Sequence, residues 1–113
     1  MYNVSVINLP LDLSDDIFDV KNELITVAAR WRDVGIALHL KFDTLDNIEN
    51  RCINEPHRCL ELMVTEWLKR NYNLKRFGEP TWQKLVDAVN SPAGGANRAL
   101  AIDIARRHKA GGM

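Results

Sequence analysis

Three tryptophans, each inside an apolar segment with helical spacing, most constrain what this chain can fold into. The segments are Trp31–Leu40, Leu60–Leu68 and Pro80–Val89. In each segment the large apolar residues recur every three or four positions, which places them on one face of a helix. Because large aromatic side chains dominate burial in a core, three such faces predict one shared core. The pattern therefore favours an all-α bundle.

Helix-start and loop residues divide the chain further, into six expected helices and no strand. A kink or short turn is expected near residues 28–30, and Gly- and Asn-containing loops at 50–54, 71–79 and 90–95. The fourth helix, opened by a proline and running to about Asn71, should be the longest. The expected start residues, most of them N-caps, are Ser14, Trp31, Asp43, Pro56, Thr81 and Asn97.

A length of 113 residues favours one domain. We expect an extended arm over residues 1–13, a helical bundle over 14–109 and a frayed tail over 110–113. The expected core follows from the apolar positions at helical spacing. It comprises Leu24, Trp31, Val34, Leu38, Leu45, Ile48, Leu60, Met63, Trp67, Trp82, Leu85, Val89, Leu100 and Ile104.

The formal net charge is zero, but the charges are separated along the chain. Residues 1–23 hold five acidic residues against one lysine, a net charge of −4, and residues 43–61 hold five acidic against two basic, −3. Residues 69–113 hold nine basic against three acidic, +6. A neutral total gives no general attraction to nucleic acid or an anionic membrane. Separated surfaces favour head-to-tail binding between copies, and solvated helix faces are the alternative explanation.

No apolar run approaches the length of about 20 residues that a membrane span needs. The first residues do not combine a basic segment with an apolar one, as a secretory signal does. We therefore expect a cytoplasmic protein, in which Cys52 and Cys59 are free thiols rather than a disulfide framework.

The residues that could carry chemistry do not form a recognised pattern. Cys52, His57 and Cys59 are near one another, but their spacing matches no zinc motif and a fourth ligand is missing. A Cys–His nucleophile would need a base and an orienting group, and no motif supplies them. The Gly94–Gly95 pair lacks the lysine of a phosphate-binding loop. The expectation is a protein that is not an enzyme and holds no metal or cofactor.

Five segments carry apolar and small residues in a recognisable order. They are Trp31, Val34, Gly35, Leu38 and Leu40; Leu45 and Ile48; Cys59, Leu60, Met63, Trp67 and Leu68; Pro80, Thr81, Trp82, Leu85, Val86, Ala88 and Val89; and Gly94, Gly95, Asn97, Leu100, Ala101 and Ile104. In this order, and over residues 14–108, the chain resembles a death domain, the helical module of apoptotic and innate-immune adaptors.

The resemblance implies an antiparallel six-helix Greek-key bundle that binds other death-domain proteins, or itself, and has no enzyme activity. It also implies three kinds of interaction surface. Mapped onto this chain, they hold Asp19, Glu23, Arg58 and Glu61; Lys69, Arg70, Lys75 and Arg76; and Asp43, Asp46 and Glu49.

Two alternatives to this function stay open. The first is another member of the same superfamily, of the death-effector or caspase-recruitment type. Residues 101–104, Ala-Ile-Asp-Ile, do not match the Arg-x-Asp-Leu signature of the death-effector type. The second is a helical nucleic-acid-binding module, which the zero net charge disfavours.

Overall fold

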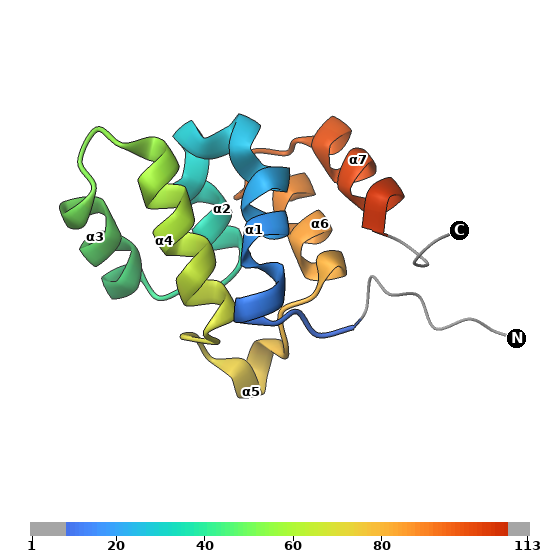
Figure 1. Ribbon diagram of the computed structural model, residues 1–113, viewed down its shortest axis with the longest axis horizontal. Coiled ribbons are helices and arrows are strands. Elements are labelled where there is room, and N and C mark those ends of the chain that lie inside the picture. Colours follow the sequence, from blue (N-terminus) through green and yellow to red (C-terminus); the bar gives the residue numbers. More distant parts are fainter. Residues whose placement is uncertain (1–8, 109–113) are drawn as a thin grey trace, which may run out of the picture.

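The computed structural model describes residues 9–108, and all the regular elements in this range are helices (Figure 1). Six are α-helices of at least seven residues, and they occupy the six expected places along the chain. The all-α fold class is thereby confirmed. The elements are α1 (Leu13–Leu24), the 3₁₀ helix η2 (Ile25–Arg30), α2 (Trp31–Ala37), α3 (Phe42–Arg51), α4 (Pro56–Leu68), α5 (Leu74–Phe77), α6 (Trp82–Asn90) and α7 (Arg98–His108).

The last two N-caps are confirmed. The Thr81 hydroxyl accepts a hydrogen bond from the backbone N–H of Lys84 at 3.1 Å and starts α6. The Asn97 side-chain oxygen accepts from the N–H of Leu100, also at 3.1 Å, and starts α7. Each oxygen satisfies one of the N–H groups that a helix start leaves without an intrahelical partner.

The first helix starts earlier than predicted, so the assignment of Ser14 as its N-cap was wrong. Asp12 is the cap, and its carboxylate accepts from the N–H groups of Ser14 and Asp15 at 3.1 and 3.2 Å. The hydroxyl of Ser14 also donates to this carboxylate, at 2.6 Å. A carboxylate accepts stronger hydrogen bonds than a hydroxyl, and Asp12 therefore takes the capping position.

Two other predicted bounds were also wrong. α3 begins at Phe42, so Asp43 lies in its first turn, where its charge complements the helix dipole, and does not cap it. α4 is the longest helix, as expected, but ends at Leu68 instead of near Asn71. Arg70 has a φ of 62°, in the left-handed region, and a helix cannot continue through that conformation.

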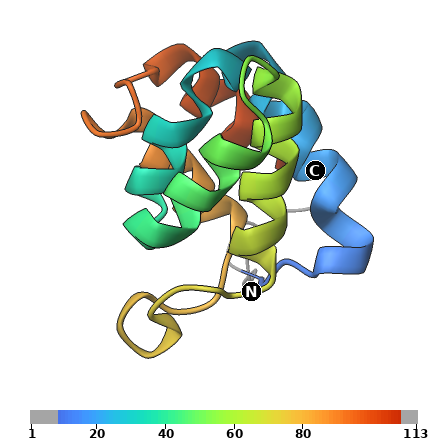
Figure 2. The same cartoon turned by 90° about the vertical axis from the view of Figure 1, so that its left-hand side faces the viewer.

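The kink near residues 28–30 is confirmed as η2, inside which Val27 leaves helical geometry. The predicted loop at 71–79 holds the short helix α5, whose start is capped by the side chain of Asn73. Figure 2 shows that the α5 segment projects from the end of the bundle. A single turn was not predicted because four residues are too few to show a helical period.

α4 is the central helix of the bundle. It packs against α1, η2, α2 and α3, whereas α6 packs mainly on α7 and joins the rest through α2 (Figure 1). Thirteen of the fourteen predicted core residues are buried; Leu100 is only partly buried. Trp31, Trp67 and Trp82 are 7%, 1% and 7% exposed. The prediction that the three tryptophans share one core is therefore confirmed.

Two glycines allow close approaches that a side chain would block. A Cβ on Gly35 would lie 2.7 Å from Leu45 and 3.2 Å from Met63, so α2 can approach α3 and α4 only without one. A Cβ on Gly94 would lie 2.0 Å from the carbonyl oxygen of Ala88. Since that oxygen belongs to the backbone of α6, the α6–α7 turn requires a glycine there.

The expectation of two free thiols was wrong, because Cys52 and Cys59 form a disulfide. α3 ends at Arg51 and α4 begins at Pro56, and the short turn between them brings the two Cα atoms to 5.6 Å. That separation lies in the range that a disulfide spans without backbone movement. The separation of seven residues along the sequence does not by itself determine the distance between the two Cα atoms.

The arm expected over residues 1–13 lies partly outside the described residues, as does the tail expected over 110–113. In the part described, the arm packs onto the bundle. Leu11 is buried, and its N–H donates to the carbonyl of Pro80 at 2.8 Å. The arm thereby fixes the start of α1 beside the start of α6.

Replacing Trp67 with Ala should lower the free energy of unfolding by about 3–5 kcal/mol, because it empties the centre of the core. A domain of this size has about 5–15 kcal/mol in total, so urea unfolding will resolve the loss. Phe18→Ala is the control, because Phe18 is 69% exposed and its loss should change stability by less than about 0.5 kcal/mol. Equal midpoints for both variants would contradict the assigned core.

Breaking the disulfide should cost about 2–3 kcal/mol, the chain-entropy estimate for a loop of this length. Urea unfolding with and without dithiothreitol measures this difference. A double variant, Cys52→Ala with Cys59→Ala, controls for other effects of the reductant and should not respond to it. An unchanged wild-type midpoint under reducing conditions would show that the bond does not form.

Candidate protein interaction surfaces

The structure uses several of the predicted interaction residues for contacts within the chain. On the surface of α1 and α4, Lys21 binds Glu61 at 3.2 Å and links the two helices. Glu23 points instead to the last helix, where it binds Arg107 and His108. Asp19 and Arg58 are exposed and form no ion pair with the described residues.

The acidic surface of α3 is partly neutralised by α2. Arg32 donates to Asp46 at 2.7 Å and to Glu49 at 3.1 Å, so one guanidinium bridges both carboxylates. Asp43, in the first turn of the same helix, is exposed and has no ion pair in the described part of the chain. Of the three predicted residues, Asp43 is therefore the one most available to a partner.

Some basic residues after α4 are likewise used for contacts within the chain, and others are not. The guanidinium of Arg70 donates to the Glu79 carboxylate at 2.8 Å and to the carbonyls of Leu68 and Leu11 at 2.6 and 2.8 Å. Arg70 therefore holds the chain together at the left-handed turn. Lys69 lies 3.7 Å from Glu66.

Lys75 and Arg76, on the projecting helix α5, are the two cations of this surface that stay available. Both are exposed, and neither pairs with a carboxylate of the described residues. The guanidinium of Arg76 lies 5.1 Å from the ring centre of Phe77, a cation–π distance. One of the two cations, Arg76, thus lies beside an aromatic side chain.

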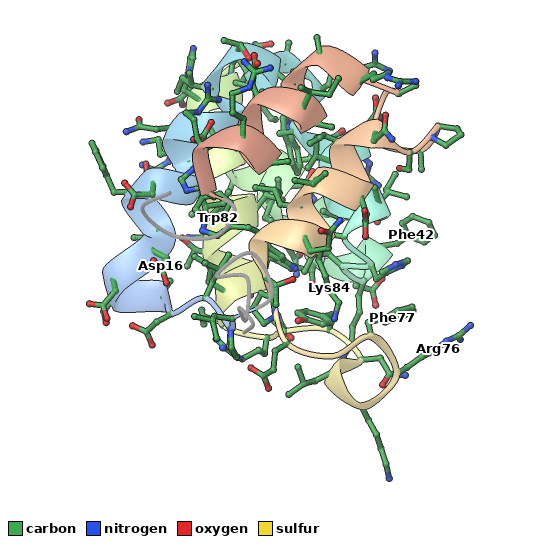
Figure 3. The ribbon with its side chains drawn as sticks, turned by 90° about the vertical axis from the view of Figure 1, so that its right-hand side faces the viewer. Asp16, Phe42, Arg76, Phe77, Trp82 and Lys84 are labelled. Carbon is green, nitrogen blue, oxygen red and sulfur yellow. A yellow bond between two sulfur atoms is a disulfide. The ribbon has the colours of Figure 1, made fainter. Side chains whose placement is uncertain are left out.

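Sequence reasoning missed a groove of about 530 Å³ between α5 and the α2–α6 side of the bundle. Its apolar wall includes Ile36, Ala37, Ala88, Ala93 and Phe77, and its charged lining is Arg76, Lys84 and Asp87. Figure 3 shows Phe77 and Lys84 together, with Arg76 pointing outward on the same side. The groove residues come from four separate segments, so no local sequence pattern could have revealed it.

Three hydrogen bonds hold the α5 side of the groove in place. The Tyr72 hydroxyl donates to the carbonyl of Gly78 at 2.7 Å, and the Lys84 ammonium donates to the carbonyls of Phe77 and Glu79 at 2.5 and 3.2 Å. Lys84 therefore lines the groove and has no carboxylate partner among the described residues. These hydrogen bonds give the groove a defined shape in the folded chain.

His39 and Phe77 stack at the groove wall, with their ring centres 3.8 Å apart and their planes at 6°. Burial, together with the nearby cations Arg76 and Lys84, holds the pKa of His39 below its usual value. The imidazole is therefore neutral at pH 7. A neutral imidazole against a phenyl ring makes this part of the wall a flat and mostly apolar surface.

A second aromatic stack joins the start of α6 to the end of α7. Trp82 of α6 stacks on His108 of α7 at 3.7 Å, and His108 contacts the Glu23 carboxylate at 2.6 Å. Arg107 donates to the same carboxylate, with one bond of 2.9 Å. This hydrogen bond, and that from His108, keeps the pKa of Glu23 below its usual value, although burial opposes the shift.

The disulfide excludes both roles considered for the cysteines, a zinc ligand and a catalytic nucleophile. A disulfide sulfur is neither a thiolate ligand nor a nucleophile. Among the described residues, no three His, Cys, Asp or Glu side chains gather in an arrangement that could bind a metal. No helix in the same range is both long enough and apolar enough to cross a bilayer.

Comparisons with family models, with curated proteins and with solved structures found no match to this chain.

Glu23→Gln should lower the free energy of unfolding at pH 7 by about 1–2 kcal/mol, because it removes the charge that Arg107 and His108 bind. The folded-state pKa of Glu23 is lowered, so its contribution is present above the unfolded value of about 4.3 and is lost as the pH falls through the folded value. The unfolding free energies of the two proteins should therefore converge as the pH falls through the folded-state pKa of Glu23.

Asp19→Asn is the matched control for this measurement. Asp19 is an exposed carboxylate of the same helix with no ion pair in the described residues. Its neutralisation should change stability by less than about 0.5 kcal/mol at any pH. A Glu23→Gln difference that persists unchanged into acid would contradict the role of the charge.

Proposed function

We propose that this chain is a protein interaction module of the death-domain type, which assembles with other such domains or with itself. The proposal includes the six-helix Greek-key topology of that family and a place in apoptotic or innate-immune signalling. The Cys52–Cys59 disulfide fits an oxidising compartment better than the cytoplasm that the sequence suggested. Its support is the order of the helical segments, the resemblance of their residues to the family, and the distribution of free charge on the surface.

The observation that carries the proposal is the separation of unpaired charges. Asp19 and Asp43 are exposed carboxylates on α1 and α3, and Lys75 and Arg76 are exposed cations on α5. Within the described residues none of the four forms an ion pair. A carboxylate surface and a cation surface at different places on one molecule favour a head-to-tail contact between molecules.

The ion pairs inside the chain reduce the number of predicted interaction residues that remain available to a partner. Asp46, Glu49 and Arg70 stabilise the fold, so their reversal would disturb the bundle and the interface together. Lys75 and Arg76 do not have that double role. A single exposed pair contributes only about 0–1 kcal/mol, and assembly therefore requires several pairs acting together.

Reversing Lys75 and Arg76 together to Glu should strongly weaken self-association and leave the melting temperature nearly unchanged. Sedimentation velocity of the 113-residue chain measures the association, at about 0.1 M salt, where the screening length is about 10 Å, and at higher salt, where it shortens. Association should weaken as salt rises. A matched reversal on α7, Arg98→Glu with Arg106→Glu, makes the same change in net charge and should have a smaller effect.

A wild-type chain that stays monomeric at every salt concentration would contradict self-assembly. Equal loss in both double variants would show that the total charge, and not the α5 surface, controls association. The first result would point to a partner of different sequence, and the second to a contact that does not depend on the α5 surface.

A further inference from the structure

Phe18 is the most exposed of the large apolar side chains described, at 69%. It lies in the middle of α1, where a well-ordered helix presents it at the surface. Burying such a ring against a partner removes about 150–250 Å² of surface from water. An isolated exposed phenylalanine is ordinary, so its surroundings decide whether it has a role.

Two exposed carboxylates of α1 lie close to Phe18 along the helix, one on its own face and one beside that face. Asp15 is three residues before it, on the adjacent turn, and Asp19 follows it directly. Both are exposed and form no ion pair in the described part of the chain. The nearest cation on this helix, Lys21, is bound to Glu61 at 3.2 Å. Phe18 is thus an aromatic side chain within an acidic surface.

The groove beside α5 has the opposite character. Its volume of about 530 Å³ leaves room for a phenyl ring, and the cations Arg76 and Lys84 outnumber its single carboxylate, Asp87. The amide of Gln83 donates to that carboxylate at 2.9 Å. Lys75 adds a further cation on α5, next to the rim.

The two surfaces cannot meet within one molecule. Figure 3 places Asp16, of the α1 segment that carries Phe18, on one side of the bundle, and Phe77 and Arg76 on the opposite side. The acidic surface of one copy can therefore reach the groove only of another copy. Repetition of such a contact gives head-to-tail growth.

We infer that Phe18 of one copy inserts into the groove beside α5 of a second copy, with Asp15 and Asp19 facing Arg76, Lys75 and Lys84. This contact rests on the proposed function and names the surfaces that carry it. The apolar insertion supplies most of the affinity, and the charges set the orientation and the salt dependence.

Two variants separate the two halves of the contact. Phe18→Ala removes the inserted ring, and Ala93→Trp fills the groove from a residue that is exposed at its edge. Each variant should self-associate about ten- to a hundredfold more weakly than the wild type in sedimentation velocity. Ile53→Ala is the control, because Ile53 is 65% exposed on a different loop and should leave association unchanged.

Mixing the two variants gives the decisive result. Phe18→Ala keeps the groove and Ala93→Trp keeps the ring, so the mixture should form a 1:1 dimer of wild-type affinity that grows no further. Melting temperatures equal to the wild type establish that both variants are folded. Phe18→Leu, which retains an apolar side chain, should recover part of the association.

Three outcomes would overturn the inference. If the wild type associates in a salt-dependent way but Phe18→Ala and Ala93→Trp associate equally well, assembly stands and this contact is wrong. If the mixture forms no dimer although each variant is folded, the ring and the groove are not partners. If the wild type does not associate, both the contact and self-assembly fail.

Discussion

The fold depends on the burial of α4 at the centre of the bundle. Trp67, with 1% of its surface exposed, lies on this helix, and α1, η2, α2 and α3 all pack around it. Because these elements share one apolar centre, a change there affects the positions of all of them. The surfaces that could bind a partner lie on the helices that this packing orients, and their geometry therefore depends on it.

Polar contacts then fix the ends of the bundle. Glu23 ties α1 to α7, Arg70 ties the end of α4 to the arm and to Glu79, and Arg32 ties α2 to α3. Glu23 and Arg70 were predicted to bind a partner, and Arg32 pairs with two more of the predicted residues, Asp46 and Glu49. Their use inside the chain leaves a smaller set of the predicted residues available to a partner. It consists of carboxylates on α1 and α3, the cations Lys75 and Arg76 on α5, and Arg58 on α4.

The groove beside α5 shows how a binding surface can arise from elements that have no common pattern. Phe77 comes from a single turn of helix, His39 from the residue after the cap of α2, and Lys84 from the first turns of α6. His39 has a φ of 72°, and this left-handed conformation places it where it stacks on Phe77. The stack and the hydrogen bonds of Lys84 give a site of defined shape with a positive rim.

The sequence by itself determined the helices and the core, because both depend on local periodicity. The spacing of Trp31, Trp67 and Trp82 within apolar stripes, and the N-caps Thr81 and Asn97, are properties that neighbouring residues define. Only the tertiary structure decided the disulfide, the pairing of the charges and the groove. The Cα atoms of Cys52 and Cys59 are 5.6 Å apart only because the α3–α4 turn brings them there. Glu23 and Arg107 are 84 residues apart along the chain and meet only after the bundle has closed. Contacts of this kind depend on distances in space, which no periodicity along the chain encodes.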